Sequence, residues 1–282
     1  MAAEDLTNEV RNKGLDQFYT NIDVSAKCID AIGDLFEWDT WDSVIEPSAG
    51  NGSFSTQIPT SVIALDISPE HESIIEQNFF DYLPNDPTKN ILVIGNPPFG
   101  KSCSLAIKFF NHAAEWANVI AFIIPKTFRR TSVQNKLNLN FHMVLDNDIQ
   151  TKPCAFNPPM SVKCCFQVWE RKTDARVSIK LPTTHDDWEF LKFGPIDANN
   201  QPTPPVGADF AIRAYGGNCG EIATEKLNEL RPKSWHWIKT TIVEKDQLID
   251  RFKKLDYSIC LNTARQNSIG KADLILLYSQ LE

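Results

Sequence analysis

Short apolar runs bounded by Gly, Pro, Asn or Asp recur in the first part of the chain. They lie at 43–46, 61–65, 90–94 and 118–124. Their shortness and their Val and Ile content are typical of strands buried on both faces of a sheet. Segments with helical spacing of apolar residues, notably 24–35 and 105–116, adjoin these runs. The alternation predicts an α/β fold with a mostly parallel sheet and helices on both faces, and further runs near 141–145 and 162–169 complete a seven-stranded sheet.

The pattern changes after Lys172, and the chain divides into four predicted segments. Residues 1–14 are an N-terminal extension, and 15–172 form the α/β domain. Residues 173–207 are a linker, because their second half is rich in Pro, Asn and Gly. Residues 208–282 form a small C-terminal α/β region, with strands expected at 209–214 and 234–241 and a helix at 244–255.

Composition narrows the class of protein. Hydrophobic residues make up 42% and charged residues 23% of the chain, which is ordinary for a folded globular protein. The N-terminus has no apolar signal-like run, and no stretch approaches the roughly 18 apolar residues that span a bilayer. We therefore expect an intracellular, soluble protein of the cytoplasm or nucleus, without a membrane partner. The net charge of −8 argues against bulk electrostatic coating of nucleic acid, so any such contact is local.

The cysteines and histidines do not predict a metal site. The chain has 7 Cys and no CxxC pair, so reduced and mostly buried thiols are expected. His185 and His236 could bind a metal in principle. They lack further ligands at useful spacing, so surface polar roles are favoured and no metal is expected.

A glycine-rich segment follows the first predicted strand. In an open α/β sheet, ligands bind outside the carboxyl ends of the strands, where glycines allow the backbone to approach closely. A turn that needs glycine only for packing is the alternative. Asp66 ends the next strand, where a carboxylate can accept hydrogen bonds from both ribose hydroxyls of a nucleoside cofactor, or can cap a following helix. The predicted ligand-binding residues here are Glu46, Pro47, Ala49, Gly50, Gly52, Asp66 and Ile67.

The tetrapeptide Asn96, Pro97, Pro98 and Phe99 directly follows the strand at 90–94. Two consecutive prolines fix the turn, so the Asn side chain and the Pro97 carbonyl can face one point. An exocyclic amine is a poor nucleophile because its lone pair is delocalised, and two acceptors on its N–H groups favour the reactive pyramidal nitrogen. Phe99 offers a flat apolar face on which an extruded base can stack. A loop turn with a buried aromatic residue is the structural alternative.

The order of these segments resembles S-adenosylmethionine-dependent adenine-N6 DNA methyltransferases, which are amino-methyltransferases with an Asn-Pro-Pro-Phe motif. The match covers roughly 15–170 and is most similar to small stand-alone members of DNA viruses and phages. The resemblance implies a Rossmann-like seven-stranded methyltransferase sheet, S-adenosyl-L-methionine as cofactor, Asp66 at its ribose, and transfer of a methyl group to adenine N6 in DNA by the catalytic residues 96–99. It also implies an N-terminal cofactor-binding stretch, which starts at Leu15 and Asp16 and continues with Gln17, Phe18, Tyr19 and Thr20.

One position departs from the family pattern, which has an Asp-Phe pair after the third strand. Here Asn78 replaces the acid or Asp81 supplies it from a shifted frame. Phe79 or Phe80 is expected to line the pocket for the cofactor's adenine.

A basic tract follows the strand at 118–124. It lies at the predicted ligand-binding edge of the sheet, where phosphates of a nucleic acid would run, although a solvated helix start is the competing interpretation. The predicted nucleic-acid contacts are Lys101, Lys126, Arg129 and Arg130.

Other functions stay open. RNA adenine is an alternative substrate because the chemistry is identical, and a catalytically silent relative that binds nucleic acid or a partner is another. The C-terminal region is expected to contact the target. Cys154 follows a proline, as in cytosine-C5 methyltransferases, but residues 96–99 already occupy the position of that nucleophile.

Overall fold

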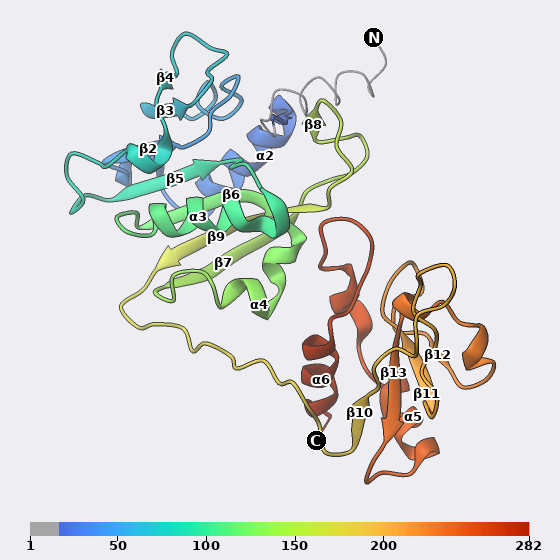
Figure 1. Ribbon diagram of the computed structural model, residues 1–282. Coiled ribbons are helices and arrows are strands. Elements are labelled where there is room, and N and C mark those ends of the chain that lie inside the picture. Colours follow the sequence, from blue (N-terminus) through green and yellow to red (C-terminus); the bar gives the residue numbers. More distant parts are fainter. Residues whose placement is uncertain (1–16, 282) are drawn as a thin grey trace. The chain divides into compact units, whose positions relative to one another are not determined.

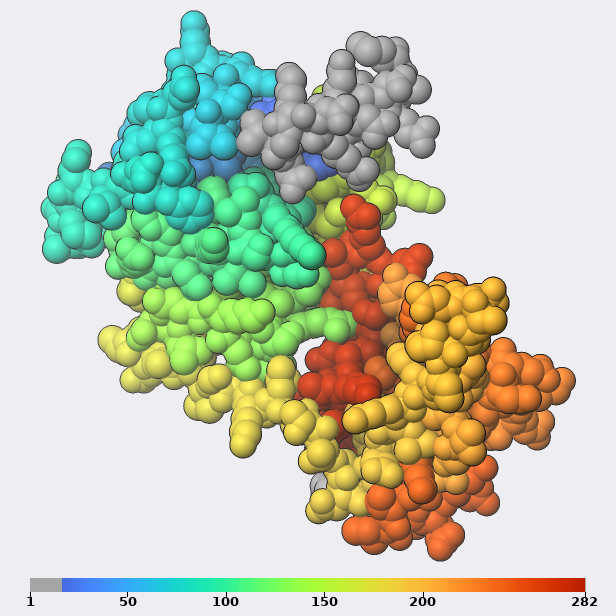
Figure 2. Space-filling model, viewed as in Figure 1, coloured from blue at the N-terminus to red at the C-terminus, as the bar shows by residue number. Residues whose placement is uncertain are grey.

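The computed structural model describes residues 17–281, which fall into two units divided between Ser178 and Ile179. This boundary lies within the predicted linker of 173–207. Figure 2 shows the first unit in blue to yellow-green and the second in yellow to red. Leu15 and Asp16 of the predicted cofactor-binding stretch lie outside the described residues.

A seven-stranded sheet with the order β4-β3-β2-β5-β6-β9-β7 forms the centre of the first unit (Figure 1). β9 is antiparallel to β6 and β7, whereas the other neighbouring strands pair in parallel. The strands are β2 Ser43–Glu46, β3 Val62–Asp66, β4 Ile75–Glu76, β5 Ile91–Gly95, β6 Val119–Pro125, β7 Phe141–Asp148 and β9 Cys164–Arg171.

Alternate residues of the central strand β5 enter two separate hydrophobic cores. Ile91 and Val93 belong to a core with residues of α3 (Ser104–Ala113), whereas Leu92 and Ile94 belong to one with residues of α2 (Ile22–Gly33). This follows from the two-residue period of a strand, because successive side chains point to opposite faces. The predicted α/β sheet with helices on both faces is thereby confirmed. A shorter helix, α4, spans Thr131–Gln134.

Two very short strands form a ribbon outside the main sheet. β1 (Tyr19–Thr20) is antiparallel to β8 (Phe156–Asn157), so that Thr20 pairs with Phe156. The N–H of Asn21 continues the pairing by donating to the Ala155 carbonyl at 2.9 Å. This ribbon ties the predicted N-terminal cofactor-binding stretch to the loop between β7 and β9.

The second unit contains a four-stranded antiparallel sheet with the order β10-β13-β11-β12. Its core joins Trp188, Phe210 and Ile238 from the sheet to residues of α5 and α6. The elements are β10 Trp188–Phe190, β11 Phe210–Arg213, β12 Ile222–Ala223, β13 Trp235–Thr240, α5 Lys245–Lys253 and α6 Lys271–Ser279.

Single turns of 3-10 helix complete the secondary structure. They are η1 Trp38–Thr40, η2 Phe79–Asp81, η3 Lys101–Cys103, η4 Lys126–Arg129, η5 Leu227–Glu229, η6 Pro232–Ser234 and η7 Tyr257–Leu261. None of the helices within residues 17–281 is both long and apolar enough to cross a bilayer.

The structure differs from the expected element pattern in several places, since β1, β8, β12 and α6 were not expected. β10 lies inside the predicted linker and pairs with β13, so 173–207 is not a loop throughout. The sequence pattern located six of the seven strands of the main sheet. The strand that it did not locate is β4, whose two residues are both exposed.

Candidate functional site

Three neighbouring parallel strands bring the predicted site residues to one edge of the sheet. β2 lies between β3 and β5, so the glycine loop after β2 lies between Asp66 and Asn96. The N–H of Gly50 donates to Asp66 Oδ2 at 2.8 Å, and the Ser48 hydroxyl donates to the Asn96 carbonyl at 3.1 Å. The loop is therefore bonded to both neighbours. Ser48 lies in the predicted glycine-rich segment but is not among the predicted ligand-binding residues.

Both oxygens of Asp66 accept a backbone hydrogen bond. Oδ2 accepts from Gly50 N, and Oδ1 accepts from Ser68 N at 2.8 Å. The expected alternative in which Asp66 caps a helix does not occur, since residues 68–74 form turns and bends. Each carboxylate oxygen has a second lone pair, so the carboxylate keeps acceptor capacity for two ligand hydroxyls. Ile67, which follows, is 55% exposed.

The ring of Tyr19 lies against Gly50. Gly50 has φ +55°, and a Cβ built on it would approach the Tyr19 ring to 2.7 Å. The Tyr19 hydroxyl donates to Glu70 Oε1 at 2.5 Å, and Glu70 N donates to the Gly50 carbonyl. Burial, with a smaller effect of the Glu70 carboxylate, raises the pKa of Tyr19. Glycine is required here for both its positive φ and its missing side chain.

Glu46 is a buried carboxyl group at the end of β2. Its side chain is 1% exposed, and Oε2 accepts from Ser55 N at 3.0 Å. Burial raises the pKa of Glu46 to about 8. Gly95 approaches it closely, since a Cβ on Gly95 would lie 3.3 Å from Glu46 Cγ. Pro47, Ala49 and Gly52 belong to the loop that Glu46 begins, and Gly52 has φ +81°.

The side-chain amide of Asn96 has a defined orientation. Nδ2 donates to the Phe18 carbonyl and to Thr20 Oγ1, each at 3.2 Å. A backbone carbonyl can only accept, so it fixes the nitrogen on this side. Oδ1 is buried and has no hydrogen-bond partner within residues 17–281. An acceptor without a partner is costly unless a ligand supplies a donor.

The turn after Asn96 is closed by backbone hydrogen bonds. The Phe99 carbonyl accepts from Leu105 N and Ala106 N at 3.2 and 3.3 Å. Pro97 is buried, whereas Pro98 and Phe99 are half-buried. Phe99 packs against the core that includes α2, as does Phe18. The half-buried ring leaves part of its surface available for a ligand.

The segment after β4 places its residues in different environments. Asn78 Oδ1 accepts from Phe80 N, and Asn78 Nδ2 donates to Asp81 Oδ2 at 3.1 Å, so both candidates for the acidic position adjoin each other. Phe79 is 1% exposed and stacks on Phe109, whereas Phe80 is 37% exposed. Of the two rings, Phe80 therefore has the surface that a ligand could contact.

The basic tract is largely neutralised by acidic residues of β7. Arg129 forms hydrogen bonds with both oxygens of Asp146 and with Asp148, and Lys126 Nζ lies 2.6 Å from Asp148 Oδ2. Arg130 is 9% exposed. Lys101 is exposed in η3, directly after the Asn96 turn. Of the four predicted nucleic-acid contacts, Lys101 is thus the one at the surface beside the site.

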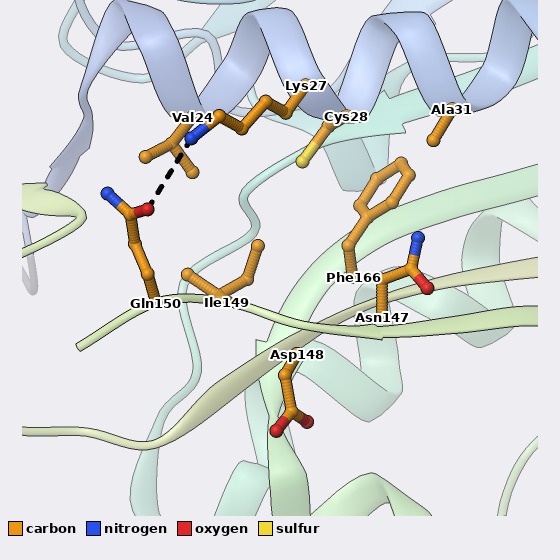
Figure 3. A pocket seen from close by; sticks show the side chains of 9 residues that line it. All are labelled: Val24, Lys27, Cys28, Ala31, Asn147, Asp148, Ile149, Gln150 and Phe166. Carbon is orange, nitrogen blue, oxygen red and sulfur yellow. Dashed lines mark hydrogen bonds between the residues drawn. The ribbon is translucent and has the colours of Figure 1, made fainter. Parts of the chain in front are cut away.

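The remaining polar candidates lie outside this edge. Cys154 is half-buried with Sγ 3.7 Å from the Met160 carbonyl, and burial raises the pKa of the Cys28 thiol. No group of three potential metal ligands occurs within residues 17–281. A pocket of about 380 Å³ lies between α2 and the strands β7 and β9 (Figure 3). Lys27 and Gln150 approach each other to 3.5 Å across it, and none of its lining residues is a predicted site residue.

No family model matches the chain, and no curated protein matches it. Similar solved structures include a candidate RNA methyltransferase from Pyrococcus horikoshii, which is 14% identical over 56% of this chain and 87% of that chain with a TM-score of 0.41. The 23S rRNA methyltransferase ErmE is 17% identical over 54% and 70%, with a TM-score of 0.38. A candidate class I S-adenosylmethionine-dependent methyltransferase from Listeria monocytogenes is 14% identical over 58% and 63%, with a TM-score of 0.44.

The first unit has a Rossmann-like α/β architecture. Its seven-stranded sheet carries helices on both faces, and the candidate site lies at the carboxyl ends of β2, β3 and β5. The expected Rossmann-like fold class is thereby confirmed.

Proposed function

We propose that this chain is a methyltransferase that transfers the methyl group of S-adenosyl-L-methionine to the N6 amine of adenine in DNA. One observation carries the proposal. Asn96 Oδ1 is a buried acceptor without a partner in the described part of the chain, at the end of β5 and in an Asn-Pro-Pro-Phe turn. An exocyclic amine is a ligand with the N–H group that this acceptor lacks.

The residues around the glycine loop fit the cofactor. Asp66 is held between two backbone N–H groups and has acceptor capacity left for the two ribose hydroxyls. Gly50 and Gly52 have positive φ and present bare backbone, and Tyr19 lies over Gly50. When bound, S-adenosylmethionine supplies a methyl group on a positively charged sulfur. Asp66, the glycine loop and the stretch of Gln17, Phe18, Tyr19 and Thr20 would hold it.

Asn96 and Pro97 activate the amine by orientation. The Asn96 oxygen accepts one N–H of the amine, and the Pro97 carbonyl accepts the other. These two hydrogen bonds favour the pyramidal nitrogen, whose lone pair is no longer delocalised into the ring and can attack the methyl group directly. No strong base is needed before the attack. As the nitrogen–methyl bond forms, the sulfur–methyl bond would break with its electron pair kept by sulfur, so that S-adenosylhomocysteine would be the leaving group. The nitrogen, which then has four bonds and a positive charge, would lose one N–H proton to water.

Phe99 holds the target base outside the nucleic-acid stack. Its half-buried ring gives a base a flat apolar surface, a contact worth about 1–3 kcal/mol. Lys101, two residues farther along the chain, is exposed and provides positive charge for the neighbouring phosphates. The other three basic residues contribute less, since carboxylates neutralise Lys126 and Arg129 and Arg130 is buried.

The test is transfer of tritiated methyl from S-adenosylmethionine to duplex DNA, single-stranded DNA and RNA in parallel, with nucleoside analysis of the product. N6-methyladenine in a DNA pool is expected, and the Asn96→Ala variant should give none. Label in RNA alone would replace DNA by RNA as the substrate. Cofactor binding without label in any pool would contradict nucleic-acid methylation.

A further inference from the structure

The orientation of the Asn96 amide depends on a segment near the start of the described chain, which we call the strap. This strap is defined here as residues 18–21, which include β1. Its Phe18 carbonyl and Thr20 hydroxyl each lie 3.2 Å from Asn96 Nδ2. Both N–H groups of the amide are thereby used within the protein, and its oxygen is the only polar atom left for a ligand.

The Asn96 side chain would serve the reaction poorly if its amide group could rotate freely. A rotation of about 180° at its last side-chain bond exchanges oxygen and nitrogen, which are nearly the same size. The nitrogen would then point at the incoming amine, where donor would face donor. The same rotation would also bring Oδ1 against the Phe18 carbonyl, an acceptor against an acceptor. The strap therefore selects the rotamer with the acceptor directed to the ligand.

Thr20 can position Asn96 because contacts with other residues hold Thr20 itself in place. It is 5% exposed and pairs with Phe156 in the ribbon of β1 and β8. Its carbonyl accepts from the Ser53 hydroxyl at 2.6 Å, which ties it to the glycine loop. A rigid acceptor holds its partner more precisely than a mobile one, and precise placement of a reacting group is worth up to about 100-fold in rate.

We infer that Thr20 is a positioning residue for methyl transfer, acting through its hydrogen bond to Asn96. This inference rests on the proposed function and adds to it, since the sequence predicted for Thr20 only a contact with the cofactor. The hydroxyl can do both, because a hydroxyl that accepts from Asn96 still has a proton to donate. The positioning role controls kcat, whereas a contact with the cofactor controls cofactor affinity.

The experiment compares Thr20→Val, which is nearly isosteric and loses the acceptor, with Thr20→Ser, which keeps it. Methyl transfer to the preferred nucleic acid gives kcat at saturating cofactor, and calorimetry gives cofactor affinity. Thr20→Val should lower kcat by about 10-fold to 100-fold, while Thr20→Ser should stay within about threefold of the wild type. Thr40→Val is the matched control, because it removes a hydroxyl that bonds the Glu37 carbonyl in η1. It should leave kcat unchanged.

Three results would overturn the positioning role. These are an unchanged kcat in Thr20→Val, a defect that saturating cofactor restores, or a Thr20→Ser variant as slow as Thr20→Val although folded. In each of them the wild type is active, so the proposed function stands. A wild type that binds cofactor but labels no nucleic acid would overturn both proposals together.

Discussion

Gly50 and Asp66 are joined by a hydrogen bond of 2.8 Å from the backbone N–H to Oδ2, although 16 positions separate them in the sequence. The bond fixes the carboxylate at the end of β3 against the loop after β2. It explains how this half-buried strand end keeps a defined geometry, since Ser68 N holds the other oxygen. The cofactor site that we propose depends on this pair, and two predictions follow from its two members.

Asp66→Ala should weaken binding of S-adenosylmethionine by at least about 10-fold, because two charge-assisted hydrogen bonds to ribose are lost. Asp66→Asn keeps one acceptor oxygen and should lie between Asp66→Ala and the wild type. Calorimetry with S-adenosylmethionine measures both affinities, and circular dichroism controls for folding. An unchanged affinity in a folded Asp66→Ala variant would refute the ribose role.

Gly50→Ala should destabilise the protein and abolish cofactor binding. The substitution forces a non-glycine residue to φ +55° and places its Cβ 2.7 Å from the Tyr19 ring. The backbone term alone costs about 1–2 kcal/mol, and the clash adds to it. Thermal unfolding of Gly50→Ala with and without Tyr19→Ala separates the two contributions. The double variant should recover part of the stability, and complete recovery would show that φ is not strained.

Glu46→Gln should change how stability depends on pH. The pKa of Glu46 is raised by burial to about 8 in the folded protein from the value of 4.5 for an exposed glutamate. Between these values the folded state holds a proton that the unfolded chain has released. The stability that this group contributes is therefore complete below about pH 4.5 and decreases as pH rises through about 8, with a slope of up to about 1.4 kcal/mol per pH unit.

Glutamine at position 46 is permanently neutral, so this decline should be absent. Urea unfolding from pH 5 to 9 should show the difference in free energy of unfolding, Glu46→Gln minus wild type, growing with pH. Glu72→Gln removes an exposed carboxylate and serves as the control for a change in net charge. A difference that does not vary with pH would mean that Glu46 is ionised throughout this range.

The main strands could be predicted because burial on both faces leaves a direct sequence signal. β2 occupies the expected residues, and β5 and β6 differ from the expectation by one position at each end. β4 could not be found in this way, since both of its residues are exposed and its pairing with β3 depends on tertiary context. The same holds for β10, which is short and follows a long irregular stretch.

The sequence predicted which loops meet but not which side chains pair. The order of motifs brought Asp66 and Asn96 to one edge, since parallel strands align their carboxyl ends. The pairing of Arg129 with Asp146 could not be predicted from the sequence, because it depends on the position of η4 relative to β7. So was the contact between Thr20 and Asn96, which depends on the ribbon of β1 and β8.

Asn96→Ala should abolish measurable turnover, a loss of at least about 100-fold, and leave cofactor affinity nearly intact. Its side chain bonds the strap, and its Oδ1 is the atom proposed to accept from the amine, whereas the residues proposed to hold the cofactor's ribose lie on β3 and the loop after β2. Asn96→Asp keeps an acceptor oxygen but loses both N–H groups, so its second oxygen faces the Phe18 carbonyl. It should also be slow. Near-normal activity of Asn96→Ala in the tritium assay would show that the catalytic assignment is wrong.

Substitution of Lys101 should affect nucleic-acid binding, whereas substitution of Arg129 should affect stability. Lys101 is exposed beside the Asn96 turn, so Lys101→Ala should weaken nucleic-acid binding and lower the slope of log affinity against log salt by about 1. Arg129 is bound to Asp146, whose side chain is 17% exposed. Arg129→Ala should therefore cost about 1–2 kcal/mol of stability with little effect on binding.

Fluorescence anisotropy over a range of salt concentrations and urea unfolding measure these two effects on the same variants. Lys192→Ala, at an exposed lysine of the second unit, controls for the loss of one positive charge. If Arg129→Ala lost nucleic-acid affinity at unchanged stability, the carboxylates of β7 would have to release Arg129 on binding, and the tract 126–130 would then contact phosphates as the sequence predicted. The opposite result, with Lys101→Ala alone affecting the salt slope, would restrict the phosphate contact to the segment beside the turn of residues 96–99, which is proposed to be catalytic.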